Sequence, residues 1–350
     1  MDKVYQPEPL NQQASVLIDA QTDIKLAVKN GILSGKPSFV IKAKITEIIT
    51  KALREINSPT LRENARKSLM QFADKAYMQL KTVLPNPAMA LAFYTLIKAI
   101  GDKKNKTFFP KNFAERSAVK AFNGGYFYSD AKGLPIRDFE PAMQRVKTAL
   151  DELAMSNALD ADDIRGRNSL RSFAEMQIRY ERHLEEIETL KKDGVKLVIC
   201  SVHADCSERC KQWQGRVYSL DGTYGVTDDG REYVPLEVAT DIYYTTKAGK
   251  TYKNGLLGFN CRHKLLPYKS GMVAPRVSET VRKKEDYITR TQRAMERSVL
   301  RWREKALMHK GVNVPEYKTA REKAVKAYER YKAFSKENGR AYYPDRVKIL

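Results

Sequence analysis

The sequence has no long apolar run and few cysteines. No segment approaches the roughly 20 consecutive apolar residues that a membrane-spanning helix requires. The first residues also lack the charged and then apolar regions of a secretory signal peptide. Only 4 cysteines occur among 350 residues, which is too few for a disulfide-stapled scaffold. These absences argue against a membrane protein and predict a chain that folds in a reducing cytoplasm.

Several enzyme signatures are missing as well. The sequence contains no His-Glu-x-x-His and no Gly-x-Ser-x-Gly. The Gly-Lys-Thr at 249–251 lacks the earlier glycine of a phosphate-binding loop, because position 244 is tyrosine. A zinc deaminase would need His-x-Glu and Pro-Cys-x-x-Cys, whereas Ala204 and Asp205 follow His203. The common hydrolases, phosphate-loop NTPases and zinc deaminases are therefore disfavoured.

Acidic residues are too few to balance the basic ones. The chain has 63 Lys and Arg against 42 Asp and Glu, a net charge of +21. Such an excess favours a polyanionic partner, most often nucleic acid, and the alternative is a solvated basic surface. Residues 276–350 carry 21 basic and 10 acidic residues, a net charge of +11. We therefore expect this segment to contact DNA without sequence preference, through Arg290, Arg293, Arg297, Arg301, Arg303, Lys323, Lys326 and Arg330.

Apolar spacing predicts a mostly helical chain. Helices are expected at 15–30, 39–56, 58–84, 88–100, 138–153, 169–192, 283–309 and 317–336. Short β-branched runs predict strands at 196–202, 216–220, 241–246 and 256–259, with a hairpin turn at 228–230. The fold class is therefore α+β, predominantly helical, with a small mixed domain inserted between helical regions.

Four segments are expected along the chain. They are an N-terminal helical region at 1–135, a helical connector at 136–196, a small mixed Cys/His domain at 197–272, and basic C-terminal helices at 273–350. Aromatic residues alternate with lysines in 101–135. We interpret that stretch as an anchor onto a core or a partner; the alternative is a platform on which bases stack.

Cysteine and histidine are concentrated in two short runs. His203, Cys206 and Cys210 are spaced i, i+3 and i+7, so a helical turn would point them one way. Cys261 and His263 are two residues apart and would share one face of a strand. If the runs meet, Cys206, Cys210, Cys261 and His263, with His203 close by, match tetrahedral zinc chemistry. The alternatives are a metal-free apolar core, a disulfide, or a thiol active site using His263.

These motifs together resemble the phage minor capsid protein 2 family, a branch of the MuF-like head morphogenesis proteins. The resemblance rests on His-Ala-Asp-Cys-Ser-Glu-Arg-Cys at 203–210, Trp-Gln-Gly-Arg-Val-Tyr-Ser at 213–219 and Gly-Phe-Asn-Cys-Arg-His at 258–263. The flanking helices agree, including Thr-Gln-Arg-Ala-Met-Glu-Arg at 291–297, and the similarity covers residues 135–345.

The resemblance implies a low-copy structural protein of a tailed-phage head rather than an enzyme. It implies association with the portal and a role in head morphogenesis and genome packaging or delivery. We expect the N-terminal helical region, whose apolar faces suit packing on a partner, to dock on the portal or the inner head. The implied partners are the portal protein, major capsid or scaffold proteins and packaged DNA. The implied location is the virion head near the portal, after assembly in the host cytoplasm. The alternative function is a metal- or thiol-dependent, nuclease-like enzyme carried in the head.

Some relatives carry a C-terminal toxin domain. The residues after His263 are basic and helical in pattern and contain no catalytic signature, so we expect that extension to be absent. A free DNA-binding regulator is disfavoured too, because neither helix-turn-helix nor zinc-finger spacing is evident.

Overall fold

The computed structural model describes residues 11–84, 87–100, 107–108, 113–122, 134–135, 139–159, 169–245, 249, 251–258 and 261–349. The chain divides into two compact units. Unit 1 contains residues 172–294 and 335–342, and unit 2 contains the described parts of 9–171, 295–334 and 343–350. The units cut across the four segments expected from the sequence, because the last part of the chain packs with the N-terminal helices in unit 2.

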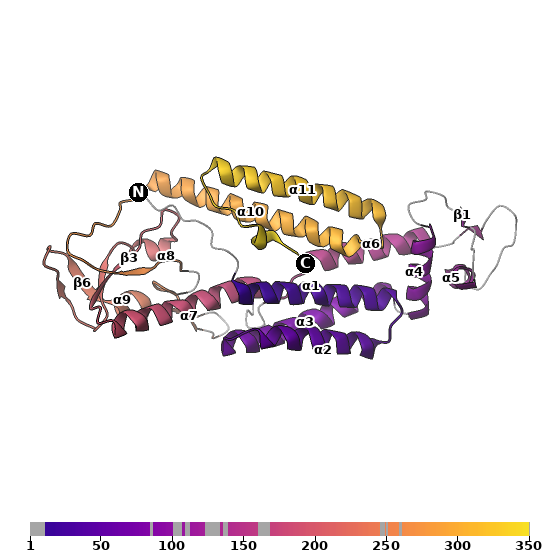
Figure 1. Cartoon of the computed structure of the whole chain (residues 1–350), viewed down its shortest axis with the longest axis horizontal. Helices are drawn as coiled ribbons and strands as arrows, with labels where there is room; N and C mark the ends of the chain where they lie inside the picture. Colours follow the sequence, from indigo (N-terminus) through magenta and orange to yellow (C-terminus); the bar gives the residue numbers. More distant parts are fainter. Residues whose placement is uncertain are drawn as a thin grey trace. The chain divides into compact units, whose positions relative to one another are not determined.

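Unit 2 is built from helices (Figure 1). The N-terminal ones are α1 (Gln12–Leu33), α2 (Ser38–Arg54), α3 (Pro59–Val83), α4 (Pro87–Ile100), α5 (Phe113–Phe122) and α6 (Phe139–Met155). The C-terminal part of α10 (Glu279–His309), most of α11 (Val314–Glu337) and a short 3-10 helix (Pro344–Val347) complete the unit. Helix α1 packs against α2, α3 and α4, while α3 packs against α6. None of the described helices combines the length and apolarity needed to cross a bilayer.

Local sequence signals set the helix boundaries. Ser58 caps α3 by accepting a hydrogen bond from the Leu61 amide at 3.2 Å, and proline follows at the first helical position. In α1, Leu17, Ile24 and Val28 are buried at helical spacing. The helices expected in the first hundred residues are therefore confirmed. The aromatic-rich stretch 101–135 lies mostly outside the described residues, which there comprise α5 and a ribbon of β1 (Thr107–Phe108) with β2 (Leu134–Pro135).

Two lysines of α1 lie inside unit 2. The Lys25 side chain is fully buried, and its ammonium lies 3.1 Å from the carboxylate of Glu304 on α10 and 3.1 Å from the Ala154 carbonyl. Burial lowers the pKa of Lys25 and raises the pKa of Glu304, and their mutual attraction opposes both shifts. One turn later, Lys29 donates to the Leu307 and Lys310 carbonyls at 3.2 and 3.3 Å. Lys29 thereby places a cation at the C-terminal end of α10, where the helix dipole favours positive charge.

Unit 1 contains a five-stranded sheet in the order β5-β6-β4-β3-β9. The strands are β3 (Leu197–Cys200), β4 (Val217–Ser219), β5 (Gly225–Val226), β6 (Glu232–Pro235) and β9 (Leu265–Pro267). Strands β4 and β6 are parallel, and the other neighbours are antiparallel. Ile187 and Leu190 of α7 (Leu170–Lys192) pack against its buried core, which includes Tyr218, Leu236 and Leu256. Short helices α8 (Glu208–Lys211) and α9 (Leu236–Thr240) and a hairpin of β7 (Tyr243–Thr245) with β8 (Thr251–Lys253) complete unit 1.

The expected fold class is confirmed, but the prediction of one strand is wrong. Residues 256–258 form a turn instead of the strand expected at 256–259, and Phe259 lies outside the described residues. The cause is close backbone packing, because a Cβ at Gly255 would lie 2.2 Å from the Ala239 carbonyl oxygen of α9. Leu257 then takes a φ of 57°, which no strand residue adopts. The strands β8 and β9, by contrast, were not expected from the sequence.

Candidate functional site

The sheet of unit 1 brings the two Cys/His runs together. Strand β3 ends at Cys200, directly opposite Leu265 at the start of β9. The chain leaving β3 and the chain entering β9 therefore run side by side, and the Ser201 amide donates to the Lys264 carbonyl at 2.9 Å. The run at 203–210 follows β3 in the sequence, and the run at 261–263 directly precedes β9. Antiparallel pairing alone thus places residues 201–210 beside residues 261–263.

Three buried side chains converge where the runs meet. The sulfurs of Cys210 and Cys261 are 3.9 Å apart, and Nδ1 of His263 lies 3.3 Å from the Cys261 sulfur. All three ligand atoms lie within 4.8 Å of one another. Each residue is at most 4 % exposed. The cysteines are free thiols, so this cluster offers two sulfurs and one ring nitrogen to a soft metal.

The other two candidates lie at the margin of the cluster. The His203 ring meets the His263 ring edge to face, with 4.8 Å between centroids. Cys206 is buried but does not belong to the converging three. The helical spacing argument fails here, because α8 begins only at Glu208. His203 and Cys206 therefore lie in the loop before α8 rather than on one helical face with Cys210. Cys200 lies in the core of the sheet.

Gln214 fixes the orientation of His263. Its Oε1 accepts from the His203 backbone amide at 3.0 Å and lies 3.1 Å from Nε2 of His263. Because a backbone amide can only donate, the amide atom of Gln214 at this position is the oxygen, and Nε2 of His263 must be the donor. In the neutral ring Nδ1 then carries a lone pair, and it faces the Cys261 sulfur. Sequence spacing did not single out Gln214, although it lies inside the Trp-Gln-Gly-Arg motif.

The pKa shifts in the cluster follow from burial and from contacts between neighbours. The hydrogen bond with Cys261 lowers the pKa of Cys210, and the same bond raises the pKa of Cys261. Cys210 is therefore the more acidic of the two thiols. Burial lowers the pKa of His203 to about 4, and the neighbouring His263 acts in the same direction, so the His203 ring is neutral. Burial raises the pKa of Cys206 to about 11, so its thiol stays protonated.

The candidate DNA-contacting residues do not all face solvent. Arg303 is half-buried and donates to the Val347 carbonyl at 2.6 Å, so it holds the C-terminal segment. Arg290 is exposed but paired with Asp286 at 2.9 Å, and Arg293 is only partly exposed. Among the predicted DNA-contacting residues, those that lie in unit 2 and are exposed form what we call the basic stripe: Arg297, Arg301, Lys323, Lys326 and Arg330.

Helical spacing and a tryptophan hold the basic stripe together. Arg297 and Arg301 are one turn apart on α10, and Lys323, Lys326 and Arg330 follow one face of α11. The two helices lie side by side (Figure 1). The ring of Trp302 on α10 lies 4.6 Å from the Lys323 ammonium and 5.6 Å from the Arg301 guanidinium. These cation–π contacts place positive charge from both helices at one location.

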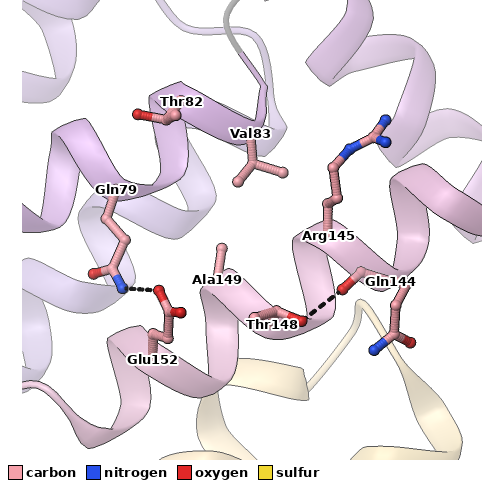
Figure 2. Close-up of a pocket in the computed structure, with 8 residues that line it drawn as sticks. All are labelled: Gln79, Thr82, Val83, Gln144, Arg145, Thr148, Ala149 and Glu152. Carbon is pink, nitrogen blue, oxygen red and sulfur yellow. Dashed lines mark hydrogen bonds between the residues drawn. The ribbon is translucent and has the colours of Figure 1, made fainter.

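A groove between α3 and α6 in unit 2 is a separate concave surface (Figure 2). Figure 2 shows Gln79 donating to Glu152 across it, at 2.8 Å. The lining residues are Gln79, Thr82, Val83, Gln144, Arg145, Thr148, Ala149 and Glu152. This lining offers neither a cysteine nor a histidine, and its single carboxylate is already hydrogen-bonded. The groove therefore lacks the paired groups of a general acid–base site.

Comparison with known proteins gives one match. A family model described as Phage minor capsid protein 2 matches residues 146–334, which is more than half of the 350 residues. The matched range includes the whole Cys/His cluster, the five-stranded sheet and the basic stripe. No curated protein and no solved structure matches the chain.

Proposed function

The chain belongs to the phage minor capsid protein 2 family, and from this membership we propose that it is a low-copy structural protein of a tailed-phage head. In this proposal it lies on the portal side of the head, acts in head morphogenesis and genome packaging or delivery, and has no catalytic role. Its partners are the portal protein, major capsid or scaffold proteins and the packaged genome. The observation that carries the proposal is the family match, which extends across most of α10 and α11 and includes the basic stripe.

The basic stripe supports contact with DNA rather than with a protein surface. Its five members are exposed cations on neighbouring helix faces, which suits phosphates spaced along a duplex. Lys and Arg side chains on two neighbouring helices can neutralise phosphates along a duplex of any sequence. We therefore propose that binding is independent of sequence and sensitive to salt.

Reconstruction of the virion without imposed symmetry tests the head placement. We expect density for this chain inside the head, at the vertex that carries the portal, with the basic stripe turned toward the genome. The copy number should be far below that of the major capsid protein. Density confined to the outer shell, or absence of the protein from purified virions, would contradict the proposal.

Titration of the full chain against duplex DNA tests the DNA contact. Replacing Arg297, Arg301, Lys326 and Arg330 by glutamine should weaken binding to any sequence, because four phosphate contacts are lost. The slope of log K against log salt should become less steep by up to about 0.9 per contact removed. Fluorescence anisotropy with two unrelated duplexes, measured at several salt concentrations, gives both quantities.

A matched variant controls for the loss of four positive charges. Lys42, Lys51, Lys75 and Lys81 are exposed on α2 and α3, and their replacement by glutamine removes the same charge elsewhere in unit 2. This control should keep the wild-type slope. Equal effects of the two variants would show that net charge, and not the basic stripe, determines binding.

A further inference from the structure

We propose that unit 1 binds one zinc ion through Cys210, Cys261 and His263, with Nδ1 of His203 as the fourth ligand.

Two of the three distances among the converging atoms already match the edges of a zinc coordination sphere. With zinc–sulfur bonds of ~2.3 Å and zinc–nitrogen bonds of ~2.0–2.1 Å, a tetrahedron has S···S edges of roughly 3.8 Å and S···N edges of roughly 3.6 Å. The corresponding distances in the structure are 3.9 Å between the two sulfurs and 3.3 Å from the Cys261 sulfur to Nδ1 of His263. A disulfide would instead require the sulfurs to approach to ~2.05 Å. The geometry therefore fits a shared cation better than a covalent bond.

The surroundings orient the ligands as a metal site requires. Gln214 holds the proton of His263 on Nε2 and so leaves Nδ1 free to coordinate. The ring of His183 lies 3.3 Å from the Cys261 carbonyl, in hydrogen-bonding distance. Two thiolates and two neutral imidazoles would balance the charge of Zn²⁺, and binding releases the thiol proton or protons to solvent. The site would thus be closed and electrically neutral, which is typical of structural zinc rather than catalytic zinc.

His203 is the best fourth ligand because its Nδ1 has no partner. That atom is buried and accepts or donates no hydrogen bond, which is unusual for a buried polar group. Its Nε2 lies 2.9 Å from the Ser201 hydroxyl, and if Nε2 carries the proton, Nδ1 presents a lone pair. The ring already packs against the His263 ring, and its Nδ1 must move toward the two sulfurs to complete the coordination sphere, because His203 lies outside the converging three. Cys206 also lies outside the converging three, and His203 is preferred because its ring contacts His263 and its Nδ1 has no hydrogen-bond partner.

Zinc would join two parts of unit 1 that are distant in sequence. Cys210 and Cys261 are 51 positions apart, and the segment between them contributes Tyr218, Leu236 and Leu256 to the core of unit 1. A cation binding both would fix the end of α8 to the chain entering β9. Zinc would therefore stabilise the folded module by its binding free energy, as in other small metal-containing domains.

Metal analysis of the full chain, purified under reducing conditions without chelator, tests this assignment. We expect one zinc per chain, and X-ray absorption should show two sulfurs at ~2.3 Å and two nitrogens at ~2.0–2.1 Å. Substitution by Co²⁺ should give the intense bands of tetrahedral cobalt together with thiolate charge transfer. These wild-type measurements do not depend on whether any variant folds. Failure of the reduced wild-type chain to bind zinc or Co²⁺ would overturn the proposal.

Variants identify the ligands. Cys210→Ser, Cys261→Ser and His203→Gln should each weaken zinc binding by more than about 100-fold, since loss of an orienting group alone costs 10–100-fold. Gln214→Ala should weaken zinc binding by only about 10–100-fold, because Gln214 orients a ligand and does not contact the metal. Cys200→Ala and Cys206→Ala are matched controls that remove a buried cysteine outside the ligand set, and both should keep full zinc content. Three sulfurs and one nitrogen around the metal, or loss of zinc in Cys206→Ala, would overturn His203 as fourth ligand.

Discussion

Replacing Lys25 by methionine should lower the free energy of unfolding of unit 2 by about 3–5 kcal/mol. The substitution keeps the length of the side chain but leaves the Glu304 carboxylate almost fully buried without its cation. Burial already raises the pKa of Glu304, and loss of Lys25 removes the larger of the attractions that oppose this shift, leaving that of Arg171. The Ala154 carbonyl also loses its donor.

Two controls separate the charge effect from the loss of packing. The double variant Lys25→Met with Glu304→Leu removes both charges and should recover most of the lost stability, because an apolar pair of similar volume often replaces a buried ion pair without penalty. Lys29→Met leaves two carbonyls without a donor but no buried charge, and should cost about 1–2 kcal/mol. A double variant as unstable as Lys25→Met would contradict the electrostatic explanation.

The two tryptophans allow unit 2 to be followed separately. Trp302 lies in unit 2 and Trp213 lies in unit 1, and the chain has 2 tryptophans in all. Urea unfolding monitored by fluorescence in a Trp213→Phe background therefore reports on Trp302 and on unit 2. In a Trp302→Phe background, fluorescence reports on Trp213 and unit 1. The Lys25 and Lys29 variants should change the unfolding transition of unit 1 little.

Gly255→Ala should destabilise unit 1 by about 3 kcal/mol, at the upper end of what overpacking costs. An added Cβ would lie 2.2 Å from the Ala239 carbonyl oxygen and 3.1 Å from that of Thr240. Both obstacles are backbone atoms, so no rotamer change can relieve the collision. The Leu256 amide donates to the same Ala239 oxygen at 2.7 Å, and a shift that made room for the Cβ would also break this bond.

Gly222→Ala is the matched control for this substitution. Gly222 has a φ of +82° and no atom near the position of an added Cβ, so alanine there costs only the left-handed backbone strain of about 1–2 kcal/mol. Unfolding followed through Trp213 in the Trp302→Phe background gives both values. Equal losses at the two glycines would mean that the chain around Gly255 moves to accommodate the added Cβ, so that the contact with α9 does not require glycine there.

Signals that act over a few residues predicted the structure well. Ser58 with Pro59 marks the start of α3, and the structure places the cap there. Lys196 to Val202 reads as a buried strand, and β3 occupies Leu197–Cys200. Such features depend on neighbouring residues only, so the sequence carries them directly.

Features that depend on distant partners could not be predicted. Periodicity treats Lys25 as a surface residue, because nothing in α1 shows that Glu304 lies opposite. The turn at 256–258 resembles a strand until the carbonyl of Ala239 is in place. The proximity of Cys210, Cys261 and His263 was expected from chemistry, but Cys206 was grouped with them by helical spacing. Helix α8 has only four residues and begins after its N-cap residue Ser207. Cys206 is therefore not helical, and helical spacing does not predict the direction of its side chain.

The discontinuity of unit 2 has a consequence during synthesis. Its N-terminal helices leave the ribosome long before Glu304 is made, and at typical elongation rates the interval is on the order of tens of seconds. Throughout that time the face of α1 that will meet α10 is open to water. Lys25 and Lys29, both on that face, are then hydrated and charged, and they oppose association of this apolar surface with other nascent chains. Lys25, which pairs with Glu304 in the folded protein, therefore acts first as a hydrated cation that favours solubility of the nascent chain.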